Sequence, residues 1–298
     1  MTNCHSSHSI SDSAQDNDLS TVEIRSTHQL KRLLQDLAAL PIKPPSIYLD
    51  ASGVGQDQLL NLQFLVPPKN TLYVIDMGCL GATILSTVSD NGESLRLILE
   101  SEAIPKVGFD IRGMSRLLFN QLNVSLGNMY DLQLMELASR DDGQSKKFLA
   151  GLSQCIVQDI PDSNIVKRRW LQSDDSTDMY LFNSRGHVPR QSRRRFELFP
   201  ALWAVYRRKL GLPGELVWLR FARAESQERV QDSKKGPGKQ DRQNLGPESW
   251  WDREQREAAI DDWNDELLME IRVGHWKLND DAEWVPTHKE NNGSIDQF

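Results

Sequence analysis

Asp50 is the residue of this sequence whose type and position most strongly suggest chemistry. It stands at the end of a short apolar run that favours a β-strand, residues 47–49 (Ile-Tyr-Leu), and the chain then breaks at Gly53 and Gly55. A carboxylate at the end of a buried strand is a candidate ligand for Mg²⁺ or Mn²⁺, because these hard cations prefer oxygen ligands. A second acid two residues further on would share its face of the strand, but that position holds Ser52. The sequence therefore predicts half of a metal site, or the remnant of one.

A second candidate chemistry is phosphate binding by arginine. Residues 160–210 hold 11 Lys and Arg against 5 Asp and Glu, in a chain whose net charge is −7. The densest part of this excess is the run Arg193, Arg194 and Arg195. Guanidinium groups bind phosphate oxygens in a bidentate manner, and phosphate contacts dominate the affinity of proteins for nucleic acid. The pattern indicates a nucleic-acid-binding surface, and a solvated charged loop is the alternative interpretation.

The spacing of apolar residues predicts the elements that must position these side chains. Helical periodicity, alternation and turn residues are the signals used. The predicted elements are a helix over 27–40, strands over 46–50, 59–66 and 71–76, a helix over 93–101, a strand over 104–110, a helix over 112–122, a short strand running into a helix over 129–140, and a helix over 146–156. A three-strand meander extended by βα units is an α/β sheet covered by helices.

The composition narrows the class of protein. A length of 298 residues with 39% hydrophobic residues supports one large domain with appendages. The three cysteines have no paired spacing, which argues against a disulfide framework or a zinc knuckle. The first residues lack the apolar core of a signal peptide, and no apolar run approaches the ~20 residues that span a bilayer. We expect a cytoplasmic or nuclear protein with no membrane partner.

Shifts in composition divide the chain. From residue 248 onward there are 14 acidic against 5 basic residues, and the first part of this tail is predicted to be an acidic helix. Trp250, Trp263 and Trp276 recur in it at a spacing that does not form one helix face, so we expect them to pin the tail onto the domain. The predicted divisions are a disordered tail (1–20), a folded domain (21–230), a linker or loop (231–248) and an acidic extension (249–298).

Several strings of residues, taken in order, carry a family resemblance. They are IYLDASG, LQFLVPPKNTLYVIDMGCLGA, LILESEAIPKVGFDIRG, YDLQLMELASR and LFPALWAVYRRKL, and the match that they carry covers roughly residues 20 to 210. In this order and spacing they resemble the DEDD-type 3′–5′ exonuclease domain, in the RNase D-like branch found in fungal proteins. The resemblance implies an α/β, ribonuclease H-like fold over 21–230: a mixed sheet flanked by helices, with a helical, acidic C-terminal extension.

The resemblance also implies a chemistry that can be compared position by position. In the family, four carboxylates hold two divalent metal ions that hydrolyse phosphodiesters. The positions of this chain that match the four acids are, in order, Asp50, Ser52, Met114 or Arg116, and Arg195 or Arg194. Only the first is an acid, and one carboxylate cannot offset the dehydration of two Mg²⁺ ions. The resemblance therefore implies degenerate catalytic motifs, and Mg²⁺ or Mn²⁺ is expected only if hydrolysis is retained.

Three functions stay open on the sequence. The first is a pseudoenzyme that binds RNA or single-stranded DNA, with Arg116, Arg193, Arg194 and Arg195 at the phosphates. The second is an active exonuclease with a rearranged one-metal site built from Asp50, Asp110 and Asp131, although Asp131 also stands where a helix cap is expected. The third is an adaptor that binds a protein partner on the nuclease scaffold.

Overall fold

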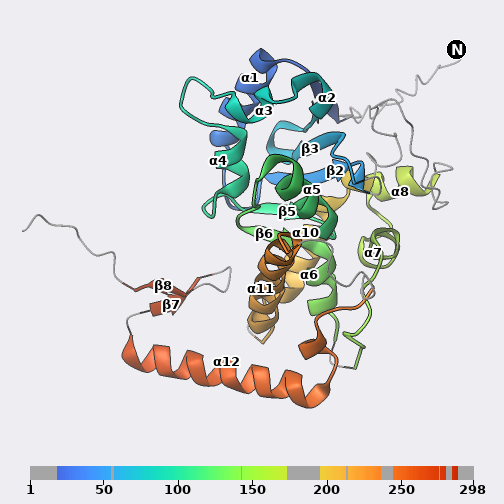
Figure 1. Ribbon diagram of the computed structural model, residues 1–298. Coiled ribbons are helices and arrows are strands. Elements are labelled where there is room, and N and C mark those ends of the chain that lie inside the picture. Colours follow the sequence, from blue (N-terminus) through green and yellow to red (C-terminus); the bar gives the residue numbers. More distant parts are fainter. Residues whose placement is uncertain are drawn as a thin grey trace, which may run out of the picture.

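The computed structural model describes residues 19–54, 57–141, 143–172, 195–212, 214–235, 244–274, 276–279 and 284–287 (Figure 1). Its centre is a mixed sheet of six strands in the order β1-β4-β3-β2-β5-β6. The strands are β1 (Ser20–Ile24), β2 (Ile47–Ser52), β3 (Asn61–Val66), β4 (Thr71–Asp76), β5 (Lys106–Gly108) and β6 (Met129–Asp131). β2, β3 and β4 form an antiparallel meander, and the pairs β1–β4, β2–β5 and β5–β6 are parallel. The predicted α/β sheet is confirmed.

Helices cover both faces of this sheet. The first group follows the N-terminal half of the chain and comprises α1 (Thr27–Ala38), α2 (Met77–Leu80), α3 (Thr83–Ser86), α4 (Leu95–Glu100) and α5 (Arg112–Leu122). The second group comprises α6 (Leu132–Ala138), α7 (Leu152–Asp159), α8 (Ile165–Gln172), α10 (Phe199–Leu210) and α11 (Leu216–Ser233). In Figure 1, α1, α3 and α4 lie on one side of the sheet, and α6, α7 and α10 lie toward the other.

Two hydrophobic clusters separate the faces. Strand residues alternate between them, as the period of two requires: Tyr48 belongs to the cluster that includes α6, α10 and α11, whereas Ile47 and Leu49 belong to the cluster that includes α1, α4 and α5. On β3, Leu65 joins Tyr48, whereas Phe64 packs on the other side. Asp50 and Ser52 therefore share the face of Tyr48, which is the face toward α10.

Most predicted elements are confirmed with shifts of a few residues. There are two differences: one strand was not predicted, and one predicted helix begins later. β1 was not predicted, because its five residues directly follow a polar segment; it extends the sheet by pairing with β4. The remainder of the predicted tail, residues 1–18, lies outside the described residues. The predicted helix over 146–156 begins only at Leu152 in α7.

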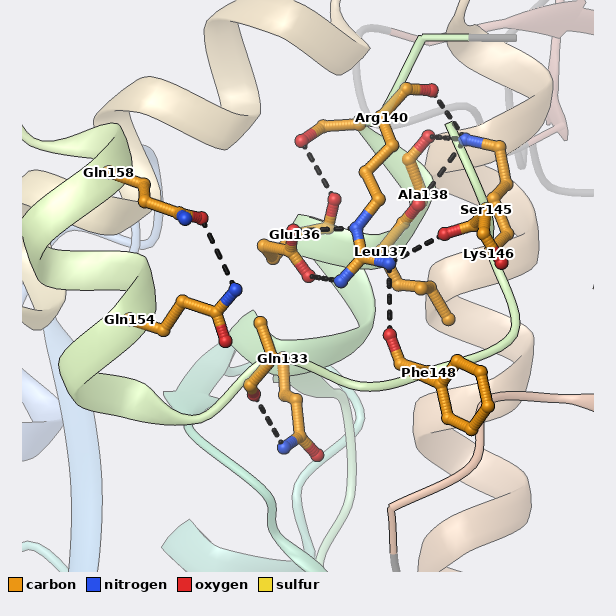
Figure 2. A network of polar contacts seen from close by, with 12 residues as sticks. Gln133, Glu136, Leu137, Ala138, Arg140, Ser145, Lys146, Phe148, Gln154 and Gln158 are labelled. Carbon is orange, nitrogen blue, oxygen red and sulfur yellow. Dashed lines mark hydrogen bonds and ion pairs between the residues drawn. The ribbon is translucent and has the colours of Figure 1, made fainter. Parts of the chain in front are cut away.

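The loop between α6 and α7 explains that difference (Figure 2). Lys146, which is 1% exposed, donates to the carbonyl oxygens of Leu137 (3.2 Å), Ala138 (2.8 Å) and Arg140 (2.6 Å), which end α6. Arg140 in turn donates to both carboxylate oxygens of Glu136 at 2.7 Å. Because the Lys146 side chain is buried and caps the C-terminal end of α6, Lys146 does not start the next helix, and residues 146–151 form an extended loop.

Part of the predicted linker packs onto this loop. Leu245 forms a β-bridge with Phe148, and the Gly246 N–H donates to the carbonyl of Lys147 at 2.9 Å. The first residues of the predicted linker belong to α11, and residues 236–243 lie outside the described part of the chain. Residues 244–247 are therefore attached to the domain.

The acidic extension begins with a short 3₁₀ turn, η5 (Glu248–Trp250), and the helix α12 (Arg253–Val273), at the bottom of Figure 1. A hairpin of β7 (Trp276–Leu278) and β8 (Trp284–Pro286) follows. Trp250 packs edge-on against Trp218 of α11, with ring centroids 5.5 Å apart, and Trp263 is buried beneath Arg220. The predicted pinning by tryptophan is confirmed for these two; the side chain of Trp276 lies outside the described part. None of the helices in the described ranges combines the length and apolarity that crossing a bilayer requires.

Candidate nucleic-acid interface

The candidate site lies at the edge of the sheet where β2, β5 and β6 end. These three strands are parallel, so their carboxyl ends meet at one edge. In open α/β sheets that edge is the usual place for ligands. Asp50 on β2 and Asp131 on β6 stand there, and Asp110 follows β5 by two residues.

Asp50 is a partly buried carboxylate at this edge. It accepts a hydrogen bond from the backbone N–H of Ala51 at 2.8 Å. Burial raises its pKa to about 6, which the Ala51 N–H and the positive charge of Arg195 only partly offset. The charge of Arg195, 145 positions further along the chain, therefore acts on Asp50.

Polar side chains surround Asp50 on the same face of the sheet. Gln63 of β3 lies directly opposite Asp50 in the antiparallel pair, and Asn61 lies opposite Ser52. Gln63 is 1% exposed and Asn61 is 3% exposed. Among the described residues, the buried Ser52 hydroxyl and the two buried polar atoms of the Gln63 amide have no hydrogen-bond partner. We call Asp50, Ser52, Asn61 and Gln63 the polar strip.

Sequence reasoning missed Asn61 and Gln63. Their signal was present, because polar residues at alternate positions of the apolar string NLQFLV lie on one face of a strand. Their relevance becomes visible only when the register between β2 and β3 is known.

Asp131 serves as a structural anchor. It is fully buried and caps α6 by accepting from the Gln133 N–H at 3.0 Å. It also accepts from the backbone N–H groups of Asp110 (2.8 Å) and Ile111 (3.0 Å), and from Nη1 of Arg229 at 2.5 Å. The prediction of a helix cap is confirmed. Alternation along β6 turns Asp131 away from the face of Asp50, because its neighbour Tyr130 shares the cluster of Tyr48.

Asp110 is held by arginine as well. Arg112 binds both of its carboxylate oxygens, with Nε–Oδ1 at 2.5 Å and Nη2–Oδ2 at 2.8 Å, and Arg229 lies 3.8 Å from Oδ1. Although burial raises the pKa of Asp110, the bound Arg112 more than offsets this and holds the pKa below its ordinary value. Asp110 is therefore a carboxylate already paired with a cation.

The two candidates for the third acid are on α5. Met114 is 5% exposed and packs in the cluster on the opposite face of the sheet from Asp50. Arg116 forms an ion pair with Asp57, Nη2–Oδ1 at 2.8 Å, in the loop that follows β2. Arg116 thus closes that loop onto α5, an arrangement that was not predicted.

The arginine run before α10 is described only at its end. Arg195 and Phe196 are described, and the predicted phosphate ligands Arg193 and Arg194 lie outside the described residues. Phe196 packs edge-on against Phe199 at the start of α10, and Phe199 lies 6.3 Å from Phe109 after β5. This aromatic contact brings the start of α10 to the end of β5, and so brings Arg195 to the site.

The residues at this edge do not fit a two-metal centre. Within the described ranges, no group of three or more His, Cys, Asp or Glu side chains could hold a metal ion. Asp110 and Asp131 bind arginine, and a guanidinium at a ligand position repels a dication. Within the described residues, Asp50, Asp110 and Asp131 do not gather into one group of metal ligands, and an active site built from them stays a prediction.

Comparison with known proteins places the fold. No protein-family model matches the sequence, and no curated protein matches it. Solved structures do match. Trypanosoma brucei RNase D in complex with RNA U12 is 16% identical with a TM-score of 0.54, and the match covers 82% of this chain and 81% of that one. The T. brucei RNase D–GMP complex is 15% identical with a TM-score of 0.53, covering 82% and 73%. At this identity the likeness concerns the fold alone: the chain has the RNase H-like exonuclease fold of these RNase D structures.

Proposed function

We propose that this chain binds single-stranded nucleic acid, RNA or DNA, at the edge where β2, β5 and β6 end, and that its two-metal hydrolysis is lost or strongly impaired. The observation that carries the proposal is the pairing of the site carboxylates with arginine: Asp131 with Arg229 at 2.5 Å and Asp110 with Arg112 at 2.5 Å. Two of the three acids at the ends of β2, β5 and β6 are thus bound to arginine, whereas a two-metal nuclease needs free anionic ligands.

Two further points support nucleic acid as the ligand. Arg195 lies four residues before α10 and its charge acts on Asp50, and arginine is suited to bidentate contact with phosphate. The T. brucei RNase D that shares the fold has been solved with RNA bound. Because the fold is shared, we propose nucleic acid as the ligand of this chain as well. Membership of the fungal RNase D-like branch, and phosphate contacts from Arg116, Arg193 and Arg194, remain predictions.

One titration separates the three candidate functions. A labelled single strand is mixed with the full chain at rising Mn²⁺, and both binding and shortening are measured. The proposal expects affinity that falls steeply with salt and no shortening at any Mn²⁺ concentration. Shortening that Asp50→Asn abolishes would establish the active exonuclease instead, and the absence of both binding and shortening would favour the protein adaptor.

A pair of charge-matched variants locates the binding surface. Arg195→Ala removes the cation beside Asp50, whereas Arg208→Ala removes an exposed cation from the other end of α10. If one phosphate contact is lost, Arg195→Ala weakens binding and lowers the salt slope by about one. Equal effects from the two variants would contradict the location proposed here.

A further inference from the structure

We infer that Arg112 is a phosphate-binding residue, and that Asp110 occupies its guanidinium until a phosphate of the bound strand displaces the carboxylate. This inference rests on the proposed function, since the phosphate is one in the backbone of the bound single strand. It arises from an ion pair after β5 that is partly exposed and has a second arginine beside it.

Four charged side chains beyond the ends of β5 and β6 form two ion pairs that differ in burial. In the inner pair, the Asp131 side chain is fully buried and that of Arg229 is 10% exposed. In the other pair, Arg112 is 31% exposed and Asp110 is 39% exposed. We call Arg112 and Asp110 the outer pair. It stands at the same edge of the sheet as the polar strip, and its exposure lets a ligand from solvent reach it.

The Arg112 guanidinium already holds an anionic group in the outer pair. Its Nε donates to Oδ1 of Asp110 at 2.5 Å, and its Nη2 donates to Oδ2 at 2.8 Å. This planar fork fits two oxygens of a phosphate as well as the two oxygens of a carboxylate. Asp110 therefore occupies a position whose geometry and charge suit a phosphate group.

Arg229 gives Asp110 a second partner when the carboxylate leaves Arg112. Nη1 of Arg229 lies 3.8 Å from Oδ1 of Asp110, which is within the distance of an ion pair. Asp110 is also partly hydrated, so a displaced carboxylate keeps both a counter-charge and water. Because an exposed ion pair contributes little to stability, exchanging Asp110 for a phosphate at Arg112 costs little.

The test measures the binding of 5′-labelled oligodeoxythymidylate to the full chain in EDTA, over a series of salt concentrations. Asp110→Asn should bind about fivefold more tightly than the wild type, because the phosphate no longer competes with a carboxylate held by an exposed ion pair. Arg112→Ala should bind more weakly and lower the salt slope by about one. The two variants thus change the affinity in opposite directions, although each breaks the same ion pair.

The choice of asparagine follows from the backbone. Asp110 has a φ of +47°, and asparagine adopts this left-handed conformation more readily than most residues. Thermal unfolding shows whether the variant is folded. If Asp110→Asn does not fold, Asp110→Gly takes its place with the same expected gain, since glycine accepts a positive φ without strain.

The double variant shows whether the gain in affinity comes through Arg112. Loss of a negative charge near a phosphate can strengthen binding through the general field, with or without Arg112. Displacement predicts instead that Asp110→Asn gives no gain in the Arg112→Ala background, so the two changes are not additive. The charge-matched control is Glu100→Gln, because the pair of Glu100 with Arg96 is similarly exposed (35% and 36%) and lies at the end of α4, next to the beginning of β5. It should leave the affinity unchanged.

The outcomes separate this inference from the proposed function. An unchanged or weaker affinity in Asp110→Asn, or a gain that persists in the Arg112→Ala background, overturns the displacement of Asp110 by phosphate. Salt-dependent binding by the wild type would in that case leave the proposed function intact. Absence of binding by the wild type and by every variant overturns both.

Discussion

Arg229 of α11 donates from Nη1 to Oδ2 of Asp131 at 2.5 Å, and this contact ties α11 to the end of β6. The Asp131 side chain is fully buried and that of Arg229 is 10% exposed. The Asp131 carboxylate also accepts hydrogen bonds from the backbone N–H groups of Asp110 and Ile111, after β5, and of Gln133 in α6. The carboxylate is thus a joint between three segments of the chain.

Removing the cation of this pair should be costly. Arg229→Met leaves the Asp131 carboxylate buried without its counter-charge, and we expect the free energy of unfolding to fall by about 3–5 kcal/mol. Urea denaturation followed by far-UV circular dichroism measures this. The control is Arg116→Met, because the Asp57 side chain in that pair is 78% exposed and an exposed pair contributes at most ~1 kcal/mol. Similar losses in both variants would show that Arg229 is not a buried joint.

We predict that the ionisation of Asp50 makes the free energy of unfolding depend on pH. Its native pKa of about 6 lies above the ordinary 3.8, so the native state binds the proton more tightly than the unfolded state does. The wild type therefore gains stability as the pH falls from 7 through 6 toward 4. An asparagine side chain cannot ionise, so Asp50→Asn should be more stable than the wild type above pH 7, by about 3 kcal/mol.

That advantage should shrink to zero below pH 4, where Asp50 is protonated in both states. Chemical denaturation of both proteins at a series of pH values gives the curve. A constant difference across the pH range would mean that the native Asp50 has an ordinary pKa, and that the carboxylate is not desolvated at the end of β2.

The fold could be predicted from the sequence where the pattern is local. The helix over 112–122 has the predicted bounds, and the strands over 59–66 and 71–76 are found with few changes, because apolar periodicity records which face of each element is buried. The site could be predicted only in part. The resemblance listed Asp50 and Arg195 among the positions of one site, and the charge of Arg195 acts on Asp50, while the roles of the two residues stay predictions.

What could not be predicted depends on pairing between distant residues. The sequence marks Lys167 as part of a basic run, yet it is 2% exposed and donates to the Val157 (2.8 Å) and Ile160 (2.6 Å) carbonyls at the end of α7. The net charge counted along a segment of sequence therefore differs from the charge that the segment exposes to solvent. For the same reason the pairing of Arg116 with Asp57, and of Arg229 with Asp131, has no signal in either local sequence.

We predict that close packing at Gly246 holds the beginning of the C-terminal extension to the domain. A Cβ at this position would meet Leu137 Cδ2 at 2.5 Å and the Lys146 carbonyl oxygen at 3.0 Å, so Gly246→Ala should push residues 244–247 away from the loop that Lys146 holds. Overpacking of this kind costs about 1–3 kcal/mol. Gly143→Ala is the matched control, since a Cβ there meets nothing within 4 Å. Thermal unfolding of both variants measures the difference, and equal Tm values would show that the 244–247 segment is not closely packed.

We predict that the Trp263 side chain holds α12 against the domain. It is the buried residue among the described side chains of α12, and the Arg220 guanidinium lies 4.8 Å from its ring centroid. The accompanying ion pair between Arg220 and Glu266, at 3.5 Å, is between half-exposed groups and contributes little. Trp263→Ala should therefore release the amides of α12 to fast hydrogen exchange. Leu268→Ala, at a residue that is 55% exposed, should not. Because the sheet and its edge do not use α12, the exchange of β2 and β3 amides should stay slow in both variants, and faster exchange there in Trp263→Ala would show that the extension also supports the candidate site.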